Sequence, residues 1–284
     1  MERPNTVLPL ARRVVAIGDV HGDYAAALRA IKLAKVIDEN HHWNGADTVL
    51  VQVGDQTDRG DSEKEIIDFL ELLRPQAIAA GGDVIVLNGN HETKNVSLDF
   101  GYVTRGGAKK FSYLYDAKKY SRDRQLRKFK RHLRGRVIAF RPGGIYAKIL
   151  STHNTIVIIG KTLFVHGGVT PKYARYGIDK INEEIEQWMK GDAHKPRVIN
   201  DSNGPLWSRV YSKNISQKGC ALLDETLDVL ALERMVVAHT VQKNAINSAC
   251  NNKVWRIDTG MSSYYGGRSQ VLEIINDSQL SILE

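Results

Sequence analysis

The feature that most constrains the fold of this 284-residue chain is a pattern that occurs three times in its first third. Each time, an apolar run rich in β-branched residues ends in a cluster of glycine, acidic, amide or imidazole residues. The clusters are Gly18-Asp19-Val20-His21-Gly22, Gly54-Asp55-Gln56-Thr57-Asp58-Arg59-Gly60 and Gly89-Asn90-His91-Glu92. Asp55 follows Asp19 by 36 residues and Asn90 follows Asp55 by 35, close to the length of one βαβ unit. The spacing therefore predicts stacked βαβ units.

The segments around these clusters carry matching strand and helix signals. The predicted strands are residues 13–17, 47–53 and 83–87. Between the first two strands, residues 23–35 are predicted to form a helix with Asp23 as its N-cap. After the second strand, Ser62 and Glu65 match a capping box, and the helix that follows is expected to end at Pro75.

The rest of the chain departs from this alternation. Further strands are predicted at residues 155–159, 162–166, 235–238, 253–257 and 270–275, and helices at about residues 179–190 and 224–233. Residues 99–145 are basic and aromatic, with Leu126, Phe129 and Leu133 at helical spacing. We expect them to form a largely helical insertion or cap within a single domain that spans residues 1–284.

The three clusters lie where an open α/β sheet binds its ligands, at the carboxyl ends of its strands. His166 and His239 also follow predicted strands. Carboxylate, imidazole and amide ligands without a thiolate suit divalent manganese, iron or zinc, and we expect two such ions, with manganese first. The expected ligands are Asp19, His21 and Asp55 for one ion, and Asp55, Asn90, His166 and His239 for the other.

A site of this kind predicts the hydrolysis of phosphate esters. A water that bridges two ions becomes a hydroxide near neutral pH, and the ions clamp the attacking and leaving oxygens of an in-line displacement. Arg59 and Arg209 are candidates to bind phosphate, because a guanidinium fork matches its oxygens. The departing oxygen needs a proton, and His91, oriented by Asp58, is the expected general acid.

The ordered set GDVHG, GDQTDRG, GNHE and HGG, with a later His239, resembles the phosphoprotein phosphatases, a branch of the calcineurin-like metallophosphoesterases. The resemblance spans about residues 14–275. It implies an α/β fold in which a β-sandwich is flanked by helices, here with a basic helical insertion. It also implies the metal, phosphate and acid roles given above, including Arg209 after the pair Leu206-Trp207.

One loop departs from the eukaryotic members of that branch. Residues 258–267 read DTGMSSYYGG, which resembles the Shewanella-like subgroup, whose members act on phosphotyrosine or on phosphoserine and phosphothreonine. Both substrate types therefore stay open. Tyr264 and Tyr265 of this loop are candidates to line the substrate pocket, and Asn90 is a candidate to contact substrate as well as metal.

Two other functions stay in competition with a protein phosphatase. A dinucleoside polyphosphate hydrolase, acting on diadenosine tetraphosphate, shares the GDxHG, GDxxDRG and GNHE motifs. A non-catalytic binding module would keep the fold and use the basic insertion to bind nucleic acid, but the intact set of ligands argues against it.

The net charge of +8 is concentrated in residues 105–136, which hold thirteen Lys or Arg and only Asp116 and Asp123 as acids. Such a segment is commonly a solvated helix face. Alternatively, its charge could steer acidic phosphopeptides or bind nucleic acid, with stacking on interleaved rings. These rings are Tyr102, Phe111, Tyr113, Tyr115, Tyr120 and Phe129. We expect a phosphorylated protein or peptide as the partner, and neither nucleic acid nor a membrane.

Composition bears on the location of the chain. It has no run of about 18 apolar residues, and its first residues lack the apolar stretch of a secretory signal. Cys220 and Cys250 show no CxxC spacing, so neither a disulfide nor a zinc–thiolate site is expected. We expect a cytoplasmic protein with reduced thiols.

Overall fold

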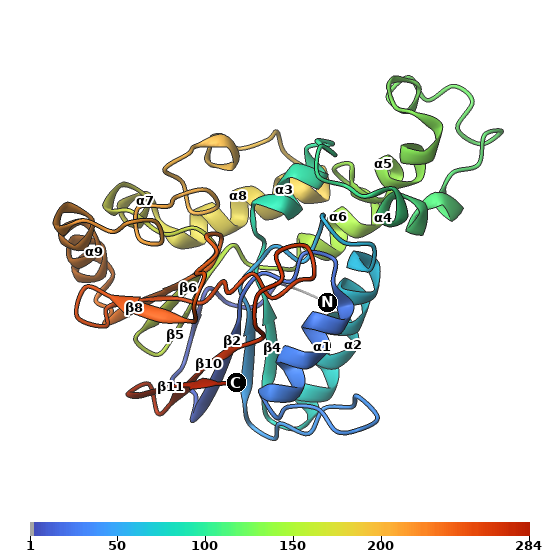
Figure 1. Ribbon diagram of the computed structural model, residues 1–284. Coiled ribbons are helices and arrows are strands. Elements are labelled where there is room, and N and C mark those ends of the chain that lie inside the picture. Colours follow the sequence, from blue (N-terminus) through green and yellow to red (C-terminus); the bar gives the residue numbers. More distant parts are fainter. Residues whose placement is uncertain (1–2) are drawn as a thin grey trace.

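The computed structural model describes residues 3–284 and consists of two β-sheets packed face to face, with helices on the outer faces (Figure 1). One sheet has five strands in the order β11-β10-β2-β3-β4. These strands are β2 (Arg13–Ile17), β3 (Val49–Gln52), β4 (Asp83–Val86), β10 (Val271–Ile275) and β11 (Gln279–Leu283). The strands β2, β3 and β4 pair in parallel, as the βαβ spacing predicts, and β10 is antiparallel to β2.

The second sheet has six strands in the order β1-β5-β6-β7-β9-β8. These are β1 (Val7–Leu8), β5 (Ile156–Ile159), β6 (Thr162–Val165), β7 (Arg234–Val237), β8 (Asn247–Ala249) and β9 (Val254–Arg256). Here β6, β7 and β9 run parallel, so their carboxyl ends also share one edge. The sequence pattern does not predict β1, β8 or β11. Each is a short or outer strand that forms by pairing with a neighbouring strand and has no clear apolar pattern of its own.

The sandwich has one apolar core between the sheets and one on each outer face. Between the sheets, Val51 and Ile85 meet Phe164 and Val236. The first outer face is covered by α1 (Tyr24–Leu33) and α2 (Glu63–Ala79). The second is covered by α6 (Ile145–Leu150), α7 (Pro171–Tyr176), α8 (Ile178–Lys190) and α9 (Gln217–Leu230). The expected α/β fold, with a β-sandwich flanked by helices, is confirmed.

Helix boundaries agree with the sequence at some ends and differ at others. Asp23 caps α1, because its carboxylate accepts a hydrogen bond from Ala26 N at 2.9 Å. Ser62 precedes α2 but makes no side-chain cap, so the predicted capping box is wrong. The end predicted at Pro75 is also wrong: proline removes only one helical hydrogen bond, and the buried Ala77 carries the apolar stripe onward to Ala79. No helix within residues 3–284 is long and apolar enough to cross a membrane.

Residues 99–145 form short helices joined by turns. They comprise α4 (Arg105–Lys110), the 3₁₀ helices η1 (Ser112–Leu114), η2 (Leu126–Lys128) and η3 (Arg131–Leu133), and α5 (Arg134–Phe140). A continuous helix through Leu126, Phe129 and Leu133 is wrong, because the chain is extended at Phe129. Leu126 instead packs with Val137 and Ile138 in a small separate core.

Cys220 and Cys250 form a disulfide, which corrects the expectation of two reduced thiols. Cys220 lies in α9, and Cys250 follows β8. Their Cα atoms are 5.4 Å apart, within the range that a disulfide spans. Their separation of 30 positions in the sequence leaves no local signal, so the pairing depends on the way α9 packs beside the β8–β9 hairpin.

Candidate active site

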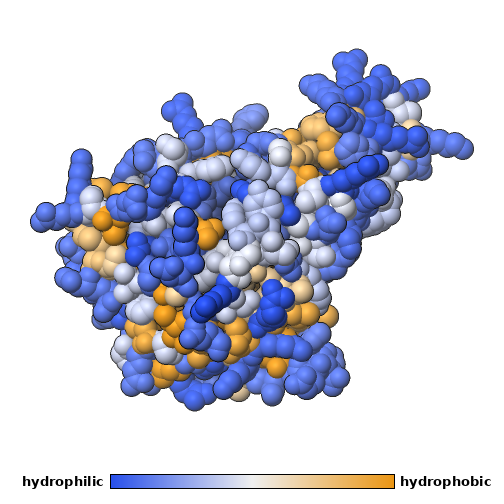
Figure 2. Space-filling view, in the orientation of Figure 1, coloured by the Kyte–Doolittle hydropathy of each residue, from blue (hydrophilic) through white to orange (hydrophobic). Residues whose placement is uncertain are grey.

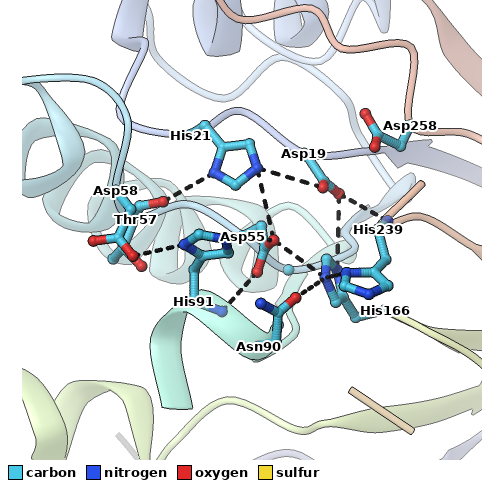
Figure 3. A network of polar contacts seen from close by, with 12 residues as sticks. Asp19, His21, Asp55, Thr57, Asp58, Asn90, His91, His166, His239 and Asp258 are labelled. Atoms are coloured by element: carbon cyan, nitrogen blue, oxygen red, sulfur yellow. Dashed lines mark hydrogen bonds and ion pairs between the residues drawn. The ribbon is translucent and has the colours of Figure 1, made fainter. Parts of the chain in front are cut away.

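The loops after β2, β3, β4, β6 and β7 meet at one edge of the sandwich (Figures 1 and 3). The third of them leads directly into α3 (Asn90–Val96). All six predicted metal ligands lie in this cluster, and none is more than 8% exposed. These are Asp19, His21, Asp55, Asn90, His166 and His239. Residues that are up to 220 positions apart in the chain are therefore gathered into one buried polar centre.

Asp55 lies at the middle of this centre. Its Oδ2 is 3.2 Å from His166 Nε2 and 3.7 Å from His21 Nε2. Two groups of side chains with ligand atoms within 4.8 Å of one another share it: Asp55 with His21 and His91, and Asp55 with His166 and His239. A carboxylate that belongs to both groups is placed to bridge two cations.

The imidazoles His166 and His21 present the same nitrogen to this centre. His166 Nδ1 lies 2.9 Å from Val53 O, and His21 Nδ1 lies 3.1 Å from Thr57 O. A carbonyl partner fixes the proton on Nδ1 and leaves the lone pair of Nε2 for a metal. This is the arrangement that metal-binding histidines commonly have.

The donor atoms around His166 also fit a cation. His166 Nε2 lies 3.0 Å from Asn90 Oδ1 and 3.1 Å from His239 Nδ1, besides the Asp55 oxygen. An amide oxygen, a carboxylate oxygen and imidazole nitrogens that converge in this way offer more lone pairs than protons. A divalent ion of the kind that nitrogen and oxygen ligands favour would satisfy them.

Asp19 is held between the two imidazole groups. Its Oδ2 lies 3.7 Å from His21 Nε2, and its Oδ1 lies 3.7 Å from His166 Nδ1. The backbone N–H of His239 donates to Asp19 Oδ1 at 3.3 Å. Asp19 therefore ties the loop after β2 to the loop after β7.

The backbone at the centre is in an unusual conformation. Five non-glycine residues have positive φ: His21 (40°), Asp55 (55°), Asp58 (69°), Arg59 (64°) and His239 (64°). Non-glycine residues rarely adopt positive φ, and such backbone strain concentrates at functional sites. Gly89 allows close approach, because a Cβ there would collide with the Asp55 carboxylate. The absence of a side chain at Gly89 therefore leaves room for the Asp55 carboxylate beside the start of α3.

Glu92 holds two of these loops together, a role that the sequence pattern does not assign. Its buried carboxylate accepts hydrogen bonds from four backbone N–H groups. They belong to Asp55 (2.8 Å), Gln56 (2.9 Å), Thr57 (3.0 Å) and Gly89 (2.7 Å). Glu92 thus fixes the loop after β3 against the start of α3, and with it the position of Asp55.

His91 and Asp58 form the predicted dyad. His91 Nδ1 lies 2.6 Å from Asp58 Oδ2, whereas His91 Nε2 faces the centre, 3.9 Å from Asp55 Oδ2. Burial disfavours the charged imidazole, but the carboxylates of Asp55 and Asp58 outweigh it and raise the pKa of His91. The raised pKa favours the protonated ring, which would donate from Nε2.

Arg59 lies beside the centre within a cage of tyrosines. Its guanidinium carbon is 4.9 Å from the ring centroids of Tyr102 and Tyr264, and 5.2 Å from that of Tyr265. It forms no ion pair with a carboxylate in the described part of the chain, and its buried Nε has no hydrogen-bond partner there. Its positive charge therefore remains available to an anion. The sequence pattern groups Tyr102 with the rings of the basic segment and does not place it beside Arg59.

Arg209 lies beside another metal-ligand candidate, His239. Its Nη1 donates to His239 O at 2.9 Å and to Thr240 Oγ1 at 2.7 Å. The two predicted phosphate-binding guanidiniums thus lie beside the metal-ligand candidates, and both predicted pocket tyrosines contact Arg59. Tyr265 also approaches His21, with ring centroids 5.6 Å apart.

Burial and neighbouring charges shift the pKa values of the ligand candidates. Burial lowers the pKa of His21 to about 4 and that of His239 to about 2. Burial opposes the charge of His166 too, but the carboxylates of Asp55 and Asp19 outweigh it and raise the pKa of His166 to about 10. Without a cation, His166 is therefore the charged imidazole among the three histidine ligand candidates, and His21 and His239 are neutral.

Asp258 is a buried acid at this centre that the sequence prediction misses. It is 1% exposed, and Figure 3 places it beside Asp19. Burial raises the pKa of Asp258 to about 6, and burial together with the Asp258 charge raises that of Asp19 well above its ordinary value. A signal was present, because Asp258 follows β9 by two residues, as Asp19 follows β2.

Comparisons with known proteins bear on this geometry. The family profile described as calcineurin-like phosphoesterase matches residues 12–243. Shewanella-like protein phosphatase 2 of Arabidopsis thaliana is 37% identical over 95% of this chain and 77% of its own length. Shewanella-like protein phosphatase 1 of Plasmodium berghei (strain Anka) is 31% identical over 89% and 68%. A solved cold-active protein-tyrosine phosphatase of a psychrophilic Shewanella species superimposes with a TM-score of 0.74 at 26% identity, covering 100% of this chain and 83% of its own.

Proposed function

The chain belongs to the calcineurin-like phosphoesterase family and is a metal-dependent phosphoester hydrolase, and we propose that it acts as a protein phosphatase. The observation that carries the proposal is the position of Asp55, whose carboxylate lies within 4.8 Å of ligand nitrogens of His21, His166 and His239 and also of His91, the proton donor of the His91–Asp58 dyad. The names of its relatives supply the substrate class, a phosphorylated protein.

The six buried ligand candidates would hold two divalent ions, with manganese as our first choice and iron or zinc as the others. Asp55 would bridge, with Asp19 and His21 toward one ion and Asn90, His166 and His239 toward the other. When bound, such a pair supplies an activated water for in-line attack on phosphorus. The convergence of lone pairs around His166 supports this assignment.

The remaining side chains would bind the phosphate and complete the proton transfer. Arg59 and Arg209 lie beside the centre and would neutralise charge on the phosphate oxygens. His91 would protonate the departing oxygen from Nε2, while Asp58 holds its Nδ1 and keeps the ring in position. Asn90 would contact substrate as well as metal.

The tyrosines beside Arg59 bear on the choice of substrate. Tyr264 and Tyr265 are exposed and flank the guanidinium. If the substrate phosphate binds Arg59, the side chain that carries this phosphate would lie next to the two tyrosine rings. Aromatic rings pack favourably against one another, which supports phosphotyrosine as a substrate. One structural relative is titled a protein-tyrosine phosphatase.

The test is a panel of phosphotyrosine, phosphoserine and phosphothreonine peptides, together with diadenosine tetraphosphate, each incubated with purified protein and manganese, iron or zinc. We expect hydrolysis of phosphopeptides, fastest for phosphotyrosine and with manganese. Turnover of diadenosine tetraphosphate faster than that of every phosphopeptide would show that the competing hydrolase assignment is correct.

The cytoplasmic location predicted from the sequence rests in part on reduced thiols. The Cys220–Cys250 disulfide removes that support, because stable disulfides are typical of oxidising compartments. We retain the proposal of a single domain, with residues 99–145 as an insertion within it.

A further inference from the structure

The basic arm, which we define as residues 105–136, carries a dense set of exposed cations. Ten Lys or Arg side chains belong to exposed residues and form no ion pair with any carboxylate of residues 3–284. They are Arg105, Lys109, Lys118, Lys119, Arg122, Arg124, Arg127, Lys128, Lys130 and Arg131. Figure 2 shows hydrophilic side chains over the projecting lobe that α4 and α5 support. The arm therefore presents positive charge that no carboxylate within residues 3–284 pairs with.

The arm is a folded platform with its own small core. Leu126 is buried against Val137 and Ile138, with Tyr115 and Tyr120 packed around them. Polar contacts fix its turns as well. Arg134 Nη1 donates to Tyr115 Oη at 2.7 Å, and Asp123 accepts from Arg141 at the same distance. The exposed cations thus project from a folded segment whose turns are held by packing and hydrogen bonds.

The aromatic residues of the arm other than Tyr113 are buried or half-buried, which decides between nucleic acid and an acidic protein segment as its partner. Phe111 is fully buried, and Tyr115, Tyr120 and Phe129 pack in or around the arm's core. Nucleic-acid surfaces of this kind use exposed rings on which bases stack. Within the arm as described, Tyr113 is the single large apolar side chain that is highly exposed, at 66%. One ring offers neither a stacking platform nor an apolar face for a lipid surface, so the charge suits carboxylates.

Both ends of the arm are anchored beside the candidate active site. Just before it, Tyr102 contacts Arg59 and lies 5.1 Å from the His91 ring, centroid to centroid. Thr104 then donates to Asp61 Oδ1 at 2.5 Å, in the loop that carries Arg59. At the other end, Arg136 is buried against Glu63 and Asp58. The arm therefore begins and ends beside the site where the phosphate would bind, and its cations project from there (Figure 1).

We propose that the basic arm docks an acidic stretch of the phosphoprotein substrate while the phosphorylated residue enters the metal centre. The inference rests on the proposed phosphatase function and names a feature of its substrate, namely carboxylates at a distance from the phosphate. Each exposed ion pair contributes little, but several together raise the association rate and the affinity. Dephosphorylation of such substrates should therefore fall as salt is added.

The test compares two phosphopeptides with the same phosphorylated site, joined through a flexible linker to six glutamates in one and six glutamines in the other. The arm variant carries Lys118→Gln, Lys128→Gln and Lys130→Gln. The matched control carries Lys32→Gln, Lys148→Gln and Lys218→Gln, three exposed lysines outside the arm that also lack an ion pair within residues 3–284. The hydrolysis of para-nitrophenyl phosphate reports on the metal centre alone.

The wild-type protein and the control variant should prefer the glutamate peptide in kcat/KM by about tenfold at low salt. The arm variant should lose most of that preference, with its rate on para-nitrophenyl phosphate unchanged. Equal rates on both peptides for the wild type, or the same preference in the arm variant, would overturn the docking role and leave the phosphatase function intact. Stronger competition by single-stranded RNA or by anionic vesicles than by polyglutamate would overturn the choice of partner. Hydrolysis of para-nitrophenyl phosphate without any cleavage of phosphopeptides would instead refute the phosphatase proposal itself.

Discussion

Arg136 Nη2 lies 3.5 Å from Asp58 Oδ1, and neither side chain is exposed to solvent. The same guanidinium donates to Glu63 Oε2 at 2.9 Å and to Asn95 Oδ1 at 2.8 Å. Asn95 in turn donates to Asp58 at 3.0 Å. A buried cation at the end of the basic arm thus balances two buried carboxylates behind the His91 ring.

The first prediction concerns this buried cation. Arg136→Met should lower the free energy of unfolding by about 3–5 kcal/mol, because it leaves the Glu63 carboxylate buried without its partner. Urea unfolding measures the change. Adding Glu63→Gln to Arg136→Met should restore part of the loss, since the unpaired charge is then removed. A single variant as stable as the wild type would contradict the buried pairing.

A second prediction separates proton donation from metal binding. His91→Asn should lower kcat by about 10²–10⁴ and leave the bound metal unchanged, because the imidazole would supply a proton and lies opposite Asp58. The loss should be largest for alkyl phosphates, whose leaving oxygens need the proton most. Rates on a series of aryl and alkyl phosphates measure this dependence. A uniform loss across the series would count against His91 as the acid.

A third prediction follows from the pKa of His166, which Asp55 and Asp19 raise to about 10 against the effect of burial. At pH 7 the imidazole of His166 in the metal-free protein is therefore protonated on both nitrogens and charged, whereas an imidazole that binds a metal must be neutral. His21 and His239, with pKa values of about 4 and 2, are already neutral at that pH and need not release a proton to bind a metal. Metal binding should release at least one proton, and affinity should rise with pH up to about 10.

Titration calorimetry with manganese, in buffers of different ionisation enthalpy, measures the number of protons released. His166→Asn serves as the matched variant and should bind metal more weakly, with less proton release. An observed enthalpy that is the same in every buffer would show that no proton leaves on binding.

The disulfide gives a fourth prediction. It closes a loop between positions 30 residues apart, so the Cys220→Ser, Cys250→Ser double variant should be about 2–4 kcal/mol less stable than the oxidised wild type. Thermal unfolding with and without a thiol reductant measures this. Reductant should lower the Tm of the wild type and leave that of the double variant unchanged. A wild-type Tm that is the same with and without reductant would contradict a stabilising disulfide.

The sequence predicts the parts of the fold that local pattern encodes. The strands before Asp19, Asp55 and Asn90 are short apolar runs between turn residues, so their positions and their shared edge follow from periodicity and spacing. The clustering of six ligand candidates follows in turn, because parallel strands end at one edge.

The misses arise where distant contacts decide the structure. Cys220 and Cys250 meet through tertiary packing, and Pro75 stays within α2 because the apolar stripe continues past it. The turns of the basic arm pack on a small core, and so few buried residues leave no helical periodicity of apolar residues in the sequence. In the sequence, Arg136 cannot be distinguished from the exposed cations around it. The folded structure buries it against Glu63 and Asp58.

The most direct test of the central claim is the metal content of the Asp55→Asn variant, measured by mass spectrometry beside its rate on para-nitrophenyl phosphate. Asp55 lies within reach of both groups of ligand candidates, so its loss should loosen both ions. The wild type should hold two divalent ions per chain, and the variant should hold fewer than one, with kcat reduced by about 10³ or more. An Asp55→Asn protein that keeps two ions and wild-type activity would contradict the bridging role.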